Sequence, residues 1–154
     1  MKFNPTRYSS AVGEVWTHFM FKVKYAHKIF DDFGHRNALR ALLLKALHKY
    51  EIRCKDNEIG FDDNHLHTEL DLGLRSKPQI AKMLKGYVGR KFFQLFPELK
   101  KPRSEGGLFW SSGLWSPAYY GGSAHGSTLA YIKRQKYGSA NLKSTQQQLA
   151  RFFA

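Results

Sequence analysis

Apolar and polar residues alternate along the chain with two different spacings. Over Val15–Tyr25 the period is two, which predicts a strand. One face of this strand would carry Val15, Phe19, Phe21, Val23 and Tyr25. The opposite face would carry Trp16, His18, Met20, Lys22 and Lys24. His65–Leu72 alternates in the same way, and its less apolar face holds His65, His67, Glu69 and Asp71.

Helical spacing follows each of these strands. Asn37–Tyr50 is predicted to be a helix because its apolar residues recur every three or four positions. A second helix is predicted from Ser76, which forms a capping box with Gln79, while Pro78 suits a first turn. A last helix is predicted from Ser127, an effective N-cap, to a stop at Gly138.

Three weaker segments complete the prediction. They are a strand over Glu51–Phe61, a loop over Pro97–Gly113 and a short aromatic edge strand over Leu114–Tyr120. The resulting order is strand, helix, strand, strand, helix, strand, helix. It predicts an α+β fold with a ferredoxin-like, or RRM-like, antiparallel sheet. Helices would pack on this sheet, and an additional C-terminal helix would carry Tyr131. We expect a single domain over 1–154, with a core of about 15–137 and a tail over 138–154.

The net charge indicates which class of partner the protein binds, but it does not bear on the fold. Lys and Arg number 25 against 12 Asp and Glu, a formal net charge of +13. A polyanion is therefore the expected partner, with nucleic acid first and an anionic membrane surface second. A solubilising excess of charge is the alternative. Cys54 is the only cysteine, which excludes a disulfide framework and a zinc site built on several thiolates. No apolar run is long enough for a bilayer, so we expect a cytoplasmic protein.

Two pairs of residues could carry chemistry. His65 and His67 would project side by side from one strand face, as two metal ligands do, although exposed strand histidines are an equal alternative. Tyr131 and Gln135 are four apart on a predicted helix, so a nucleophilic hydroxyl and an oxygen ligand would share one face. An ordinary helix surface is the alternative there. Asp63 is in phase with the histidines and is a possible accessory group, or simply a turn residue.

The order of these residues along the chain resembles that of a known family. Two histidines that flank a hydrophobic residue, followed by a tyrosine helix, are typical of the HUH-class single-tyrosine transposases of prokaryotic insertion sequences. The likeness is carried, in order, by VKYAHK at 23–28, DNHLH at 63–67, GLWSPAYY at 113–120 and YIKRQ at 131–135. The family often has a proline-aspartate step before the histidines, whereas this chain has Asp62-Asp63-Asn64.

The resemblance implies a mechanism and a site. Tyr131 would attack a metal-bound phosphate of single-stranded DNA, leaving a 5′-phosphotyrosine and a free 3′-hydroxyl. The metal ligands would be His65, His67 and Gln135. Mn²⁺ suits the two imidazoles, and Mg²⁺ is abundant and binds phosphate. The substrate would bear hairpins near the ends of the element, and the protein would be a homodimer. Candidate phosphate contacts are Lys22, Lys24, Lys82, Lys85, Arg90 and Lys91. Candidates for stacking on bases, about half of them expected in the core, are Trp110, Trp115, Tyr119 and Tyr120.

Two alternatives remain open at this stage. One is a rolling-circle-type HUH nuclease, which has the same chemistry and acts at a replication origin. The other is a basic module that binds single-stranded nucleic acid without catalysis.

Overall fold

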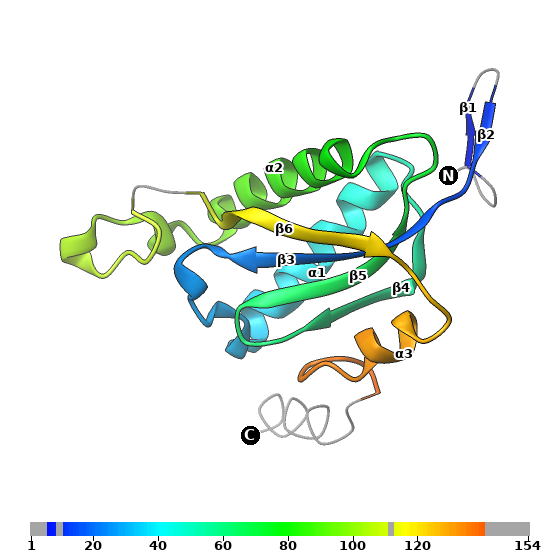
Figure 1. Cartoon of the computed structure of the whole chain (residues 1–154). Coiled ribbons are helices and arrows are strands. Elements are labelled where there is room, and N and C mark those ends of the chain that lie inside the picture. The colour runs from blue at the N-terminus through cyan, green and yellow to red at the C-terminus, as the bar shows by residue number, and fades with distance from the viewer. Residues whose placement is uncertain (1–5, 9–10, 111–112, 141–154) are drawn as a thin grey trace.

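The core of the protein is a four-stranded antiparallel sheet. The computed structural model describes residues 6–8, 11–110 and 113–140. The strand order is β4-β5-β3-β6, as Figure 1 shows. These strands are β3 (Trp16–Val23), β4 (Cys54–Phe61), β5 (His65–Asp71) and β6 (Trp115–Ser123). Two helices, α1 (Phe33–Lys49) and α2 (Lys77–Leu95), cover one face. This is the predicted α+β, ferredoxin-like arrangement.

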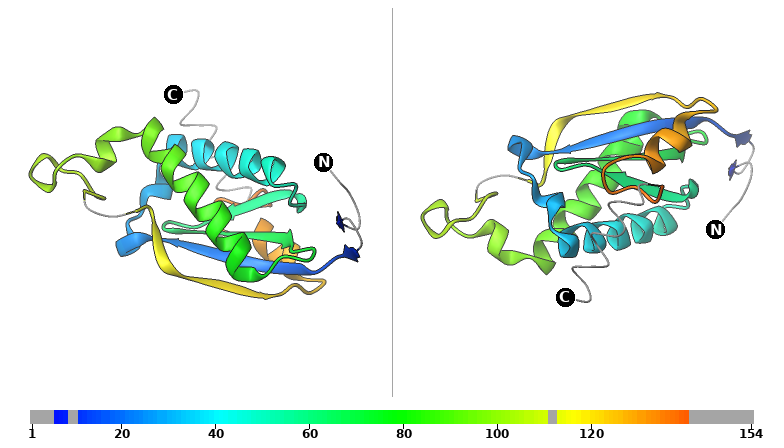
Figure 2. Two further views of the ribbon diagram at one scale, coloured as in Figure 1. Left: turned by 90° about the horizontal axis from the view of Figure 1, so that it is seen from above. Right: turned by 90° about the horizontal axis from the view of Figure 1, so that it is seen from below.

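Alternation along β3 divides the sheet into two faces. Thr17, Phe19, Phe21 and Val23 are buried against α1 and α2. The residues between them lie on the other face and pair with β5 as Trp16–Asp71, His18–Glu69, Met20–His67 and Lys22–His65. A third helix, α3 (Thr128–Lys133), packs on this second face, as the two views of Figure 2 show. The predicted division of polar and apolar residues in β3 is therefore confirmed.

The predicted end of the first strand is wrong by two residues. β3 stops at Val23, and the 3₁₀ turn η1 (Lys24–Ala26) follows it. Tyr25 has a φ of 59°, which breaks the extended backbone and turns its side chain outward. Lys24 and Tyr25 therefore do not extend the two faces of the strand.

Capping residues explain where the helices begin. α1 starts at Phe33, four residues before the predicted Asn37, because the Asp32 carboxylate accepts a hydrogen bond from the His35 amide at 2.9 Å. The predicted capping box of Ser76 and Gln79 is present at the start of α2. The predicted loop over Pro97–Gly113 contains two 3₁₀ turns, η3 (Pro97–Lys100) and η4 (Arg103–Glu105).

The two ends of the chain add little to the core. A small hairpin of β1 (Thr6–Tyr8) and β2 (Ala11–Gly13) precedes β3 and was not predicted, because strands of three residues show no measurable period. Most of the predicted tail, residues 141–154, lies outside the described residues. Within the described part of the chain, no helix has both the length and the apolar character that a membrane crossing requires.

Candidate active site

Two histidines of β5 project from the face that carries α3. The ring centroids of His65 and His67 are 5.0 Å apart, as expected for residues two apart on a strand. His67 is only 4% exposed, so the alternative of a pair of exposed strand histidines does not describe it. Its Nδ1 lies 2.9 Å from Nε2 of His18 on β3. Its Nε2 is buried and has no hydrogen-bond partner among the described residues.

The electrostatic surroundings keep the His67 ring neutral. Burial, with smaller contributions from the neighbouring His18 and His65, lowers the pKa of His67 to about 3. A neutral imidazole with one nitrogen in a hydrogen bond presents a lone pair on the other nitrogen. The unpartnered Nε2 is therefore suited to a metal ion or to a hydrogen-bond donor of a ligand.

Helix α3 brings a tyrosine to these histidines. The ring centroid of Tyr131 lies 5.5 Å from that of His67 and 5.8 Å from that of His18. The tyrosine is 46% exposed, so a ligand in solvent can reach it. Gly60 on β4 makes this position possible, because a Cβ there would collide with the carbonyl oxygen of Ile132. Gly60 pairs with His67 across the sheet, so α3 packs directly beside the buried histidine.

Gln135 lies in a turn and not on the helix that the sequence predicts. α3 ends at Lys133, because the following amides turn back onto nearby carbonyls and Gly138 N donates to Gln135 O at 2.8 Å. Gln135 nevertheless stays in the site. Its Cγ is 3.0 Å from the position that a Cβ of Gly60 would occupy, and its Nε2 donates to Tyr131 O at 3.3 Å. Gln135 therefore packs beside Gly60, the cross-strand partner of His67, and is hydrogen-bonded to the backbone of Tyr131.

These residues fit a divalent metal with a mixed ligand set. Within the described chain, no three His, Cys, Asp or Glu side chains converge on one point as metal ligands. A site here would need an amide oxygen from Gln135 beside the imidazoles of His65 and His67. The unpartnered Nε2 of His67 supports this set, because a buried nitrogen without a partner is costly unless a ligand satisfies it.

The two aspartates before the histidines have different partners. Asp63 pairs with Lys136 at 2.6 Å, and this hydrogen bond lowers the pKa of the Asp63 carboxyl. Asp63 thus anchors the segment after α3. Asp62, the residue before Asp63, has its Oδ2 at 3.5 Å from His65 Nε2. The carboxylate near the candidate ligands is therefore that of Asp62.

Of the six candidate phosphate-binding cations, only Lys22 lies next to the histidines. Lys22 pairs with His65 across β3 and β5 and is exposed. Four others are on α2, against the opposite face of the sheet, and they are Lys82, Lys85, Arg90 and Lys91. Lys85 donates to Ser116 O at 2.8 Å and to Pro117 O at 3.3 Å, so it also supports the start of β6.

Sequence reasoning gave too little weight to some residues of the site. A cavity of about 530 Å³ brings His18, His67 and Tyr131 together with Tyr120 and Arg134. His18 could have been found from its phase on β3, because it shares a face with Lys22. Arg134 could have been found from its position three residues after Tyr131. Of the four candidate stacking aromatics, Trp110 and Tyr120 are about half-exposed, whereas Trp115 is buried and Tyr119 packs against the core.

Comparison with known proteins shows which family the sequence matches and which solved structures share the fold. The model of the family described as "Transposase IS200 like" matches residues 11–135. A solved structure of a candidate transposase from Deinococcus radiodurans R1 is similar, with a TM-score of 0.63 and 23% identity over 84% of this chain and 93% of that one. A second is a REP-associated tyrosine transposase bound to a REP hairpin, with a TM-score of 0.52 and 9% identity over 86% and 71% of the two chains. At these identities both structures show the fold alone. A search of curated proteins finds no match.

Proposed function

The chain belongs to the IS200-like transposase family, and we propose from this premise that it cuts and rejoins single-stranded DNA through a covalent bond to Tyr131. The observation that carries the proposal is the contact between Tyr131 and His67 in one cavity. The tyrosine is reachable from solvent, while the histidine beside it is buried, neutral and has an unpartnered nitrogen.

His65, His67 and Gln135 would hold a divalent metal, Mg²⁺ or Mn²⁺. When bound, the ion would polarise the scissile phosphate and neutralise the charge that develops on it. The protein's own groups orient the phosphate. Lys22 beside His65 and Arg134 beside Tyr131 supply positive charge on either side of the histidines.

The chemical step exchanges one phosphate ester for another. Tyr131 Oη bonds to phosphorus as the bond from phosphorus to the 3′ oxygen breaks. The phenol proton passes to solvent, and the leaving oxygen takes up a proton to become a 3′-hydroxyl. The 5′ phosphate remains on the tyrosine. No nucleotide cofactor is needed, because the energy of the broken ester is kept in the new one, and attack by another 3′-hydroxyl rejoins the strand.

The proposed substrate is single-stranded DNA with hairpins near the ends of an insertion element. The resemblance of the four sequence motifs points to it, and the related structure with a REP hairpin supports it. A homodimer is proposed on the same resemblance. Sedimentation of the free protein and of its hairpin complex would measure this assembly.

One experiment tests the covalent mechanism. Labelled single strands from the element's ends are incubated with the protein in Mn²⁺ or in EDTA and separated on a denaturing gel. We expect a metal-dependent, protease-sensitive adduct that Tyr131→Phe abolishes while DNA binding survives. Tyr120→Phe is the matched control, because Tyr120 is equally exposed in the same cavity.

The outcomes separate the alternatives. An adduct that persists in Tyr131→Phe and is lost in Tyr120→Phe would show that Tyr120, and not Tyr131, is the nucleophile. Tight binding without any adduct would favour the non-catalytic binding module. Cleavage at a replication origin and not at hairpin-bearing ends would favour the rolling-circle-type nuclease.

A further inference from the structure

A second cavity, of about 480 Å³, opens at the end of the molecule where β3 turns into η1. Its walls come from Tyr25, His27, Arg103, Leu108 and Trp110, together with two glycines of the same loop. We propose that this cavity binds an unpaired nucleobase of single-stranded DNA. This inference rests on the proposed function, because it assumes that the protein acts on DNA, but it concerns DNA binding and not strand cleavage.

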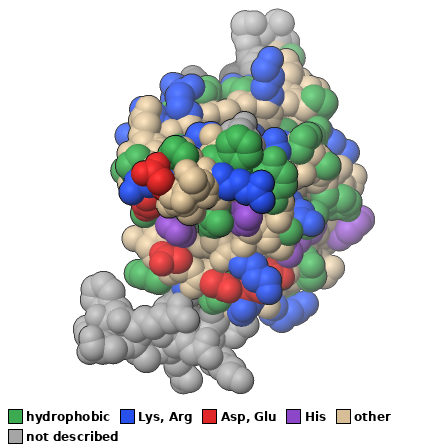
Figure 3. All heavy atoms as spheres, turned by 90° about the vertical axis from the view of Figure 1, so that its left-hand side faces the viewer, with side chains coloured by type: hydrophobic (Ala, Val, Ile, Leu, Met, Phe, Trp, Pro, Cys, Tyr) green, Lys and Arg blue, Asp and Glu red, His purple; other side chains and the backbone are tan. Residues whose placement is uncertain are grey.

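Exposed apolar side chains gather at the mouth of this cavity. Tyr25 is 65% exposed, Trp110 51% and Leu108 41%. Figure 3, which views this end of the molecule, shows hydrophobic side chains beside cations and histidines. A flat aromatic side chain that is held in solvent provides a platform on which a base can stack, whatever its sequence.

The platform is rigid and not a loose loop tip. The ring of His27 packs edge-on against Tyr25 at 5.8 Å and against the fully buried Phe109 at 5.1 Å. Tyr25 and Ala26 are consecutive non-glycine residues with φ of 59° and 55°, a costly conformation that persists only where the surrounding structure holds it in place. On the other wall, a Cβ at Gly107 would collide with Lys101 O, so the loop is closely packed.

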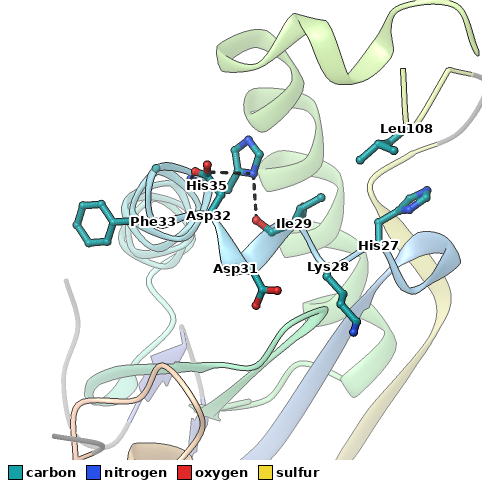
Figure 4. A pocket seen from close by; sticks show the side chains of 9 residues that line it. His27, Lys28, Ile29, Asp31, Asp32, Phe33, His35 and Leu108 are labelled. Atoms are coloured by element: carbon teal, nitrogen blue, oxygen red, sulfur yellow. Dashed lines mark hydrogen bonds and ion pairs between the residues drawn. The ribbon is translucent and has the colours of Figure 1, made fainter. Parts of the chain in front are cut away.

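The charges around the cavity suit a nucleic-acid strand. The Lys24 ammonium lies 5.7 Å from the Tyr25 ring, and Arg103 lines the wall. No carboxylate lines this cavity among the described residues. The adjoining cavity in Figure 4 shares His27 and Leu108 and adds Lys28, but it also contains the carboxylates of Asp31 and Asp32, which would repel phosphate. The cavity beside Tyr25 lacks such carboxylates and therefore suits a polyanion better than its neighbour does.

The base cavity is joined directly to the candidate active site. Asn64 Nδ2 donates to Ala26 O at 3.4 Å, and Asn64 Oδ1 lies 2.8 Å from His65 Nδ1. Val23 N donates to Asn64 O at 2.8 Å, which fixes the same junction through the backbone. Lys22, the cation beside His65, precedes Tyr25 by three residues, at most roughly 11 Å of chain. A strand with one base in the cavity can therefore reach Lys22 beside His65.

The test measures what bases contribute to binding. Affinities for oligothymidylate and for a strand of equal length without any bases are compared by fluorescence anisotropy. The protein carries Tyr131→Phe and the buffer contains EDTA, so that no chemistry takes place. We expect Tyr25→Ala and Trp110→Ala each to reduce the preference for the strand with bases by about 5- to 100-fold. Tyr25→Phe and Trp110→Phe should keep it, because a ring remains.

Leu74→Ala is the control, because Leu74 is also half-exposed but follows β5, at the other end of the sheet. It should leave the preference unchanged. The inference is overturned if the two alanine variants keep the preference, or if they weaken binding of both strands equally. Since the assay contains no metal and no nucleophile, a failure of the proposed cleavage would leave its result intact.

Discussion

His18 Nε2 lies 2.9 Å from His67 Nδ1, across the neighbouring strands β3 and β5. One of these two nitrogens must carry the hydrogen. If His67 Nε2 is to offer its lone pair, then Nδ1 carries the hydrogen and His18 Nε2 accepts it. His18 is therefore the residue that sets the tautomer and the ring orientation of His67, as hydrogen-bond partners of metal-binding histidines do.

We expect His18→Ala to weaken Mn²⁺ binding by about 10- to 100-fold, because His67 loses the partner that orients it. Manganese binding followed by electron paramagnetic resonance measures this without DNA or catalysis. His18→Gln keeps a polar group that can accept the hydrogen bond and should retain much of the affinity. His48→Ala is the control, because His48 is an exposed histidine on α1, and this variant should bind Mn²⁺ as the parent protein does. Equal Mn²⁺ affinity in His18→Ala and in the parent protein would contradict this role.

Gly60→Ala should displace the tyrosine from the histidines. The added methyl group would meet Ile132 O, so α3 must move away from β4. We expect a cost of about 1–3 kcal/mol in the free energy of unfolding and at least a tenfold loss of covalent adduct. Urea unfolding and the adduct gel measure the two effects. In contrast, Gly86→Ala on α2 meets no atom within 4 Å and should stabilise the protein by about 0.5–1 kcal/mol.

Lys22→Gln and Lys82→Gln should differ in their effect on single-stranded DNA. Lys22 shares the histidine face, whereas Lys82 lies on α2 behind the sheet. Losing one phosphate contact lowers the slope of log affinity against log salt by about 0.7 for a single strand. We expect this decrease for Lys22→Gln alone, measured by anisotropy over a salt series. An equal decrease for Lys82→Gln would mean that the strand also follows the α2 face.

The only cysteine gives a pH-dependent test of the fold. Burial raises the pKa of the Cys54 thiol from 9.0 to about 11, with a smaller opposing effect from its contact with Thr68 Oγ1 at 3.2 Å. At pH 8 the thiolate population, and with it the rate of alkylation, should be about 100-fold lower in the folded than in the unfolded protein.

The sign of the effect of Cys54 on stability follows from the same shift. Because the folded-state pKa is the higher one, the contribution is fully present below pH 9 and is lost between about pH 9 and pH 11. Cys54→Ala should lack this loss when stability is measured by urea unfolding across that range. An equal decline in both proteins would show that the thiol remains accessible to water.

Local patterns predicted the parts of the fold that depend on neighbours in sequence. A period of two predicts the two faces of β3 and the shared face of His65 and His67, and a spacing of three residues predicts the capping box of α2. The end of α3 could not be predicted from such local spacing. It depends on Gly60, which is more than 70 residues earlier, and on the turn that closes at Gly138. The partner of Asp63 could not be inferred either, because Lys136 is 73 residues away and was not a candidate for any role.

The docking of α3 on its own sheet has a kinetic consequence. Beyond the Gly60 contact, Lys133 pairs with Asp56 at 3.1 Å, Lys136 with Asp63, and Tyr137 N donates to Phe61 O at 2.9 Å. These contacts hold Tyr131 at a high effective concentration relative to the histidines of the same chain. In the proposed reaction, the first cut would therefore be unimolecular in protein, and its rate per DNA-bound chain would not change on dilution. Transfer of a strand between copies would first require this helix to detach, and would be the slower event.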